Sequence, residues 1–178
     1  MTKRVFVSID LPSEVKAQLK YLQRPEIRPV KWMKPDNFHI TLNFLGELNE
    51  SQIQEATKIL EYVSNLGERF VLKLVAFQAE RDMLWLIPEN HAKLFELQGV
   101  LKDRFEDIKL GKRERRGYSP HILFAKTKTG RRFEWEMDNF QALSYAVDRV
   151  NLYESRLTPE SATHILIKSF PFSDETSP

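Results

Sequence analysis

Two short stretches decide the fold of this chain: Phe38-His39-Ile40-Thr41-Leu42 and Pro120-His121-Ile122-Leu123-Phe124. Each places a single histidine in a run of apolar and β-branched residues, a composition that is typical of a β-strand. Because successive side chains of a strand point to opposite faces, each stretch combines one apolar face with one face that carries an imidazole. The sequence therefore predicts two similar strands, each presenting one histidine.

The alternation along each strand assigns the neighbours of each histidine to a face. On the first strand we expect one face to hold His39, Thr41 and Asn43, and the other Phe38, Ile40, Leu42 and Phe44. On the second strand we expect one face to hold Ser119, His121 and Leu123, and the other Pro120, Ile122 and Phe124.

The rest of the chain supplies further strands and three amphipathic helices. Strands are predicted at Arg4–Ile9, 31–33, Arg69–Phe77 and Met83–Ile87, and the segment from Phe133 to Phe172 is β-rich with a turn near 158–160. Apolar residues recur at helical spacing in three sets, the last behind a possible cap at Asn90: Val15, Leu19 and Leu22; Ile53, Ala56, Leu60 and Val63; and Leu94, Leu97, Leu101 and Phe105. We therefore expect an α+β fold with two pseudo-symmetric lobes of antiparallel strands and outer helices, each lobe lending one histidine strand to a central cleft.

Length and composition are those of an ordinary globular protein. The 178 residues predict one domain, residues 1–178, and no low-complexity linker divides them. The absence of cysteine excludes disulfides, thiol catalysis and cysteine-ligated metals. We see no apolar signal core at the start and no apolar run near the roughly 20 residues that a membrane helix needs. We therefore expect a cytoplasmic protein that does not contact a membrane.

Basic residues flank the second histidine although the net charge is only +2. Lys109, Lys112, Arg113, Arg115 and Arg116 precede it, and Lys126, Lys128, Arg131 and Arg132 follow it. Such a concentration of positive charge attracts an anionic substrate, of which phosphate esters are the usual kind. The alternative interpretation is a solvated basic loop.

Two imidazoles that face one cleft can supply both the base and the acid of phosphodiester hydrolysis, if one is neutral and the other protonated. Thr41, on the face of His39, could donate to a phosphate oxygen, and this scheme needs neither a metal nor a cofactor.

Two alternatives remain open: the histidines could be half-buried structural residues, or metal ligands, although no His-x-His or Glu-x-x-His cluster supports a metal site. We interpret His91 as a surface residue of a helix and His164 as a packed strand residue.

The chain also resembles a known family. The block Trp32–Glu47, which contains His39-Ile40-Thr41-Leu42, is similar to the first His-x-Thr-x block of the two-histidine phosphoesterases, and most similar to the RNA 2′,3′-cyclic phosphodiesterases, also called 2′-5′ RNA ligases. The opening strand Arg4–Pro12, Leu84-Trp85-Leu86, Tyr118-Ser119-Pro120-His121 and the segment Leu152–Leu157 follow in the order that the family shows.

The resemblance implies a bilobal fold, no cofactor, and opening of an RNA 2′,3′-cyclic phosphate to leave a 2′-phosphate. It implies that His39 is the acid toward the 3′ oxygen and His121 the base for water, with Thr41 on the phosphate. It further implies substrate contacts from Tyr118, Lys126 and the basic segment with Arg113, Arg115 and Arg116. The expected partner is RNA or an oligonucleotide with a cyclic phosphate end, bound by a monomer.

Two positions depart from the family pattern. The second block has Leu123 where the family has threonine or serine, so one hydroxyl donor to the phosphate is missing. Lys126 stands where the family often has arginine, which keeps the charge but loses the two-pronged hydrogen bonding. The leading hypothesis is therefore an RNA cyclic phosphodiesterase. The alternatives are a phosphodiesterase for small cyclic nucleotides or 2′-5′ linked oligonucleotides, and a non-catalytic RNA-binding relative.

Overall fold

Most of each histidine stretch forms a strand as predicted, and the two strands belong to different sheets, but the second strand begins at Ile122, so Pro120 and His121 precede it. The computed structural model describes residues 1–111, 117–133, 140–158 and 162–173. Over these residues the order of elements is β1 (Lys3–Asp10), α1 (Ser13–Tyr21), β2 (Val30–Trp32), the 3-10 turn η1 (Pro35–Asn37), β3 (His39–Leu48), α2 (Glu50–Leu66), β4 (Phe70–Glu80), β5 (Met83–Pro88), α3 (Ala92–Asp107), β6 (Ile122–Thr127), β7 (Leu143–Val147), β8 (Arg149–Leu157) and β9 (Ala162–Pro171).

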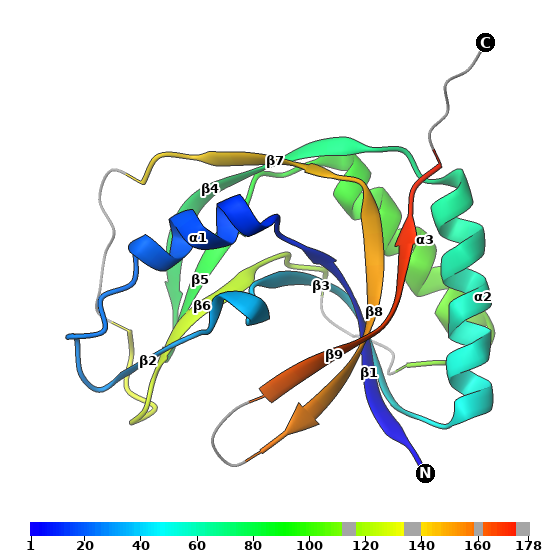
Figure 1. Cartoon of the computed structure of the whole chain (residues 1–178), viewed down its shortest axis with the longest axis horizontal. Helices are drawn as coiled ribbons and strands as arrows, with labels where there is room; N and C mark the ends of the chain where they lie inside the picture. Colours follow the sequence, from blue (N-terminus) through cyan, green and yellow to red (C-terminus); the bar gives the residue numbers. More distant parts are fainter. Residues whose placement is uncertain (112–116, 134–139, 159–161, 174–178) are drawn as a thin grey trace.

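Within the described residues the strands form two antiparallel sheets (Figure 1). The first sheet has the order β3-β1-β8-β9, and the second has the order β2-β6-β5-β4-β7. The first sheet thus combines strands from both ends of the chain, and the second combines the early strand β2 with strands from its middle. The predicted α+β fold with one histidine strand in each half is confirmed, and the two halves interlock rather than follow each other in sequence.

The long helices form where the apolar spacing predicts them. Helix α2 begins with a capping box, in which the Asn49 side chain accepts from the Gln52 backbone N–H and the Gln52 side chain accepts in return. Its predicted stripe from Ile53 to Val63 is buried, as is the stripe of α3 from Leu94 to Phe105. The two helices contact each other and the first sheet, α2 through β3, β8 and β9 and α3 through β3. None of the helices in the described part of the chain is long and apolar enough to span a membrane.

The start of α3 differs from the prediction. The N-cap is His91 and not Asn90, and the His91 side chain makes no capping hydrogen bond. The His91 ring instead stacks on Phe70 of β4, with ring centroids 4.9 Å apart, and is half-buried. The prediction of a surface histidine was wrong because the ring packs against the neighbouring strand.

The face assignment of β3 is correct up to Leu42 and then reverses. The pairing of β1 with β3 shifts register between Val7 and Ser8, and Leu42 is the extra residue on β3. Asn43 therefore pairs with Val7 and has a buried side-chain oxygen, whereas Phe44 pairs with Phe6 and is 55% exposed. A β-bulge of this kind inverts the alternation without leaving a clear signal in the sequence.

A buried aromatic contact joins the two histidine stretches on their core side. Phe38, directly before His39, stacks on Phe124 of β6 with ring centroids 5.6 Å apart, and neither side chain is exposed. Trp32 of β2 also packs edge-on against Phe124. Because these rings lie on the core faces of their strands, they hold the opposite faces, which carry the histidines, in a fixed relation to each other.

Candidate active site

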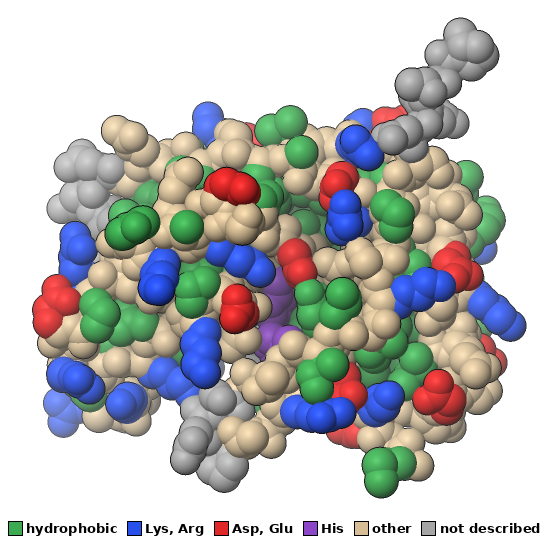
Figure 2. Space-filling view, in the orientation of Figure 1, with side chains coloured by type: hydrophobic (Ala, Val, Ile, Leu, Met, Phe, Trp, Pro, Cys, Tyr) green, Lys and Arg blue, Asp and Glu red, His purple; other side chains and the backbone are tan. Residues whose placement is uncertain are grey.

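The two sequence-predicted histidines lie at the beginning of their strands, each half-buried and pointing away from the core. His39 is the first residue of β3, and His121 directly precedes β6. Strands β3 and β6 contact each other, and the charge of His121 acts on His39, so the two imidazoles share one site. The space-filling view shows histidine side chains at the bottom of a hollow in the middle of one face (Figure 2).

Both imidazoles are anchored in the same way. The Nδ1 atom of His39 lies 2.8 Å from the carbonyl oxygen of Asn37, and the Nδ1 atom of His121 lies 2.9 Å from the carbonyl oxygen of Ser119. A carbonyl oxygen only accepts, so each Nδ1–H is the donor. This fixes the tautomer of each neutral ring and leaves its lone pair on Nε2, where it can exchange a proton with a substrate.

His39 sits among aromatic rings of the first sheet. Its ring centroid is 5.0 Å from that of Phe6 and 5.1 Å from that of His164, which meets it edge-on. Burial lowers the pKa of His39 to about 4, and the charges of His164, Lys16 and His121 act in the same direction, against the hydrogen bond to Asn37. His39 is therefore neutral at pH 7 in the free protein.

His164 belongs to the site, which the sequence did not indicate. The prediction of a packed strand residue is correct, since His164 is half-buried in β9 and its ring lies 5.0 Å from Phe6. Burial lowers its pKa as well, while the carboxylate of Asp10 opposes the shift. Asp10 in turn accepts a hydrogen bond of 2.5 Å from the Tyr153 hydroxyl.

His121 has a different neighbour. The indole of Trp85, on β5, stacks on the His121 ring with centroids 4.0 Å apart and planes 16° apart. Trp85 pairs across the sheet with Leu123, so all three side chains lie on one face of the second sheet. Trp85 stood in a motif that the family shares, but nothing in its spacing indicated contact with a histidine.

The predicted phosphate-contacting positions lie beside the histidines. Thr41 is half-buried on the face of His39 and pairs with Ser8 of β1. Leu123 is half-buried on the face of His121, where the alternation places it. The Tyr118 hydroxyl donates to the carbonyl oxygen of Thr41 over 3.1 Å, so Tyr118 connects the second histidine segment to the first histidine strand.

Basic side chains lie farther along β6. Lys126 is exposed and stands opposite Lys31 of β2 and Met83 of β5. The register puts these side chains on the same face of the second sheet. The basic segment with Arg113, Arg115 and Arg116 lies outside the described residues.

Over the described residues this arrangement combines two imidazoles anchored at Nδ1, a hydroxyl beside one of them and a lysine farther along β6. Acid–base transfer at two atoms of one bound group is the chemistry for which such a pair is suited. The surroundings of His39 also alter its proton affinity, since burial lowers the pKa of that ring.

Comparisons with known proteins identify relatives over nearly the whole chain. The model of the LigT like phosphoesterase family matches residues 9–81. The RNA 2′,3′-cyclic phosphodiesterase of Methanothermobacter thermautotrophicus is 27% identical over 173 residues, which cover 89% of this chain and 93% of that protein. The protein of the same name from Thermotoga maritima is 29% identical over 168 residues, 88% of each chain. The crystal structure of E. coli LigT complexed with 3′-AMP matches with a TM-score of 0.85 at 21% identity, over 97% of this chain and 99% of that one.

Proposed function

We propose that the chain is a LigT-like phosphoesterase, one of the two-histidine enzymes that its sequence resembles, and that it hydrolyses the 2′,3′-cyclic phosphate end of RNA to a 2′-phosphate. The observation that carries the proposal is the matched anchoring of His39 and His121, each with Nδ1–H on the carbonyl oxygen two residues earlier. Two relatives named for this activity cover nearly the whole chain at modest identity, which supports the same substrate class.

In the proposed reaction, the Nε2 atom of His121 takes a proton from water, and the water oxygen attacks phosphorus. The bond from phosphorus to the 3′ oxygen breaks, and His39 gives its Nε2 proton to that oxygen. The products are a 2′-phosphate and a free 3′-hydroxyl. Because both transfers use protein imidazoles, the proposed chemistry is independent of a metal.

His39 must be protonated to act as the acid, although burial holds its pKa at about 4 in the free protein. The negative charge of a bound phosphate favours the imidazolium and so opposes this desolvation. His39 would therefore take up its proton together with the substrate.

The remaining residues are proposed to bind the phosphate and the RNA backbone. Thr41 donates its hydroxyl to a non-bridging oxygen beside His39. Lys126, opposite Lys31, attracts the phosphates of the adjoining nucleotides. From the sequence we assign the same role to the basic segment with Arg113, Arg115 and Arg116.

We also propose that residues 1–178 act as one bilobal unit. Each sheet contains strands from distant parts of the chain, and one contiguous set of buried side chains runs through both. That this unit is a monomer and works in the cytoplasm remains a prediction.

The test is to incubate the purified protein and EDTA with an RNA that ends in a 2′,3′-cyclic phosphate, and to identify the phosphate on the product. We expect a 2′-phosphate and a free 3′-hydroxyl. A 3′-phosphate would contradict the proposed leaving group, and turnover that needs added zinc or manganese would contradict the metal-independent mechanism. Binding of this RNA without any turnover would favour the alternative of a non-catalytic relative, in which Leu123 has removed an essential donor.

A further inference from the structure

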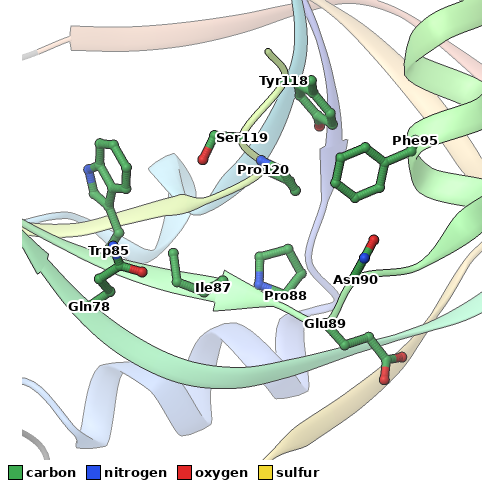
Figure 3. Close-up of a pocket in the computed structure, with 10 residues that line it drawn as sticks. All are labelled: Gln78, Trp85, Ile87, Pro88, Glu89, Asn90, Phe95, Tyr118, Ser119 and Pro120. Carbon is green, nitrogen blue, oxygen red and sulfur yellow. The ribbon is translucent and has the colours of Figure 1, made fainter. Parts of the chain in front are cut away.

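A pocket of about 260 Å³ opens directly beside His121 (Figure 3). It forms where strand β5 ends, helix α3 begins and the segment before His121 crosses. Two of its lining residues also hold His121, since Trp85 stacks on the imidazole and the carbonyl of Ser119 anchors Nδ1. A ligand in this pocket therefore contacts the same two residues, Trp85 and Ser119, that hold the reacting imidazole.

Aromatic rings stand at both ends of the pocket. Phe95 and Tyr118 meet edge-on at one end, with centroids 5.5 Å apart and planes 75° apart, and Trp85 lies at the other end (Figure 3). Phe95 is 37% exposed and lies outside the buried stripe of α3. An exposed phenylalanine that does not serve the core, at the rim of a cavity, is suited to contact a flat ligand.

The polar groups of the pocket are mostly neutral. Gln78, Asn90 and Ser119 contribute amide and hydroxyl groups that both donate and accept hydrogen bonds. The one charged residue among the described lining residues is Glu89, a carboxylate. Such a lining disfavours a phosphate, whereas it fits an uncharged aromatic ring system with hydrogen-bonding edges.

We propose that this pocket holds the nucleobase of the nucleotide whose cyclic phosphate is hydrolysed. The inference rests on the proposed function, because it places the base of that substrate. The volume is below the roughly 300–1,000 Å³ of pockets for drug-sized ligands, so it suits one base rather than several nucleotides. The chain of the RNA then leaves the hollow along Lys126 of β6 and Lys31 of β2, away from Glu89.

The test compares two RNAs that both end in a 2′,3′-cyclic phosphate, one with an intact last nucleotide and one with an abasic last ribose. For the unaltered protein we expect KM to be about tenfold higher for the abasic substrate, with kcat unchanged. We expect Phe95→Ala to raise KM about tenfold for the intact substrate and to leave KM for the abasic substrate unaltered. Tenfold corresponds to about 1.4 kcal/mol, within the range for stacking of one base.

Tyr62→Ala is the matched control, since Tyr62 is an exposed aromatic residue on the neighbouring helix α2, 51% exposed and outside this pocket. It should alter neither KM. Equal KM values of the unaltered protein for both RNAs, or a Phe95→Ala effect of the same size on both, would overturn the inference while the proposed function stands. Failure to hydrolyse either RNA would instead contradict the proposed function itself.

Discussion

The two halves of the site hold their histidines alike but surround them differently. His39 and His121 each donate Nδ1–H to the carbonyl oxygen two residues earlier. Around His39 lie Phe6 and a second imidazole, His164, whereas His121 stacks on the single indole of Trp85. One half of the site carries a threonine beside its histidine and the other a leucine.

The anchoring of Nδ1, which the two halves share, sets the geometry of the imidazoles. The neighbours that differ set the proton affinity of His39 and the hydrogen bonding beside each ring. Anchoring Nδ1 directs both Nε2 atoms outward, which any acid–base pair requires. Burial lowers the pKa of His39 below its ordinary value, and the charge of His164 lowers it further. The hydroxyl of Thr41, which Leu123 lacks, makes the His39 strand the better donor of hydrogen bonds to a phosphate.

Removing either imidazole should have the largest effect. We expect His39→Ala and His121→Ala each to lower kcat by about 10²–10⁴-fold on cyclic-phosphate RNA, since each removes one proton transfer. The double variant should be little worse than either single variant, because the pair acts as a unit. Steady-state kinetics, with circular dichroism as a control for folding, would show this. Near-normal turnover in either single variant would show that the two histidines do not act as a pair.

Removing the hydroxyl of the His39 half should have the next largest effect. Thr41→Val preserves the branched shape but has no donor, and we expect kcat to fall about 10–100-fold, the value of one hydrogen bond to a charged group. Thr41→Ser restores a hydroxyl and should recover most of the loss. Were serine as poor as valine, the methyl packing of Thr41 rather than its hydroxyl would be the important feature.

Giving the His121 half the same hydroxyl should make the two halves more alike. We expect Leu123→Thr to raise kcat by up to about tenfold, which needs about 1.4 kcal/mol of transition-state stabilisation. Leu123→Val is the control, since it is branched like threonine but has no hydroxyl, and it should give no gain. If threonine and valine behave alike, another donor already serves that oxygen.

Altering the second imidazole should have the smallest effect, on the pH profile rather than on the rate. Desolvation chiefly lowers the pKa of His39, and the charge of His164 adds to it. Because a like charge disfavours the imidazolium, His164→Gln should raise the pKa of His39. The acid limb of kcat/KM should then begin at a higher pH than in the unaltered protein. His91→Gln, at the start of α3, is the control and should leave the limb in place; a shift of equal size there would exclude a specific role for His164.

The local sequence was sufficient for the parts of the site that lie within one strand. Alternation put His121 and Leu123 on one face, and the same rule put His39 beside Thr41. It failed at Asn43 and Phe44, because the bulge at Leu42 depends on the pairing with β1 and not on β3 itself.

Contacts between distant elements could not be predicted from the sequence. His164 reaches His39 only because β9 joins the sheet that β3 begins, and Trp85 reaches His121 only because β5 pairs with β6 in one particular register. His164 contributes to the lowered pKa of His39, and Trp85 contributes to the packing of His121. The sequence could therefore indicate which residues react, but not why the two differ.

The most direct test of the central claim is a pH titration of the protein labelled with ¹⁵N-histidine, in which the chemical shifts of the ring nitrogens are measured at each pH. Spectra of His39→Gln and His121→Gln assign the signals to the two rings. We expect both neutral rings to carry their proton on Nδ1, and His39 to take up its second proton only near pH 4. A proton on Nε2 of either neutral ring, or titration of His39 near its ordinary value of about 6.5, would contradict this expectation.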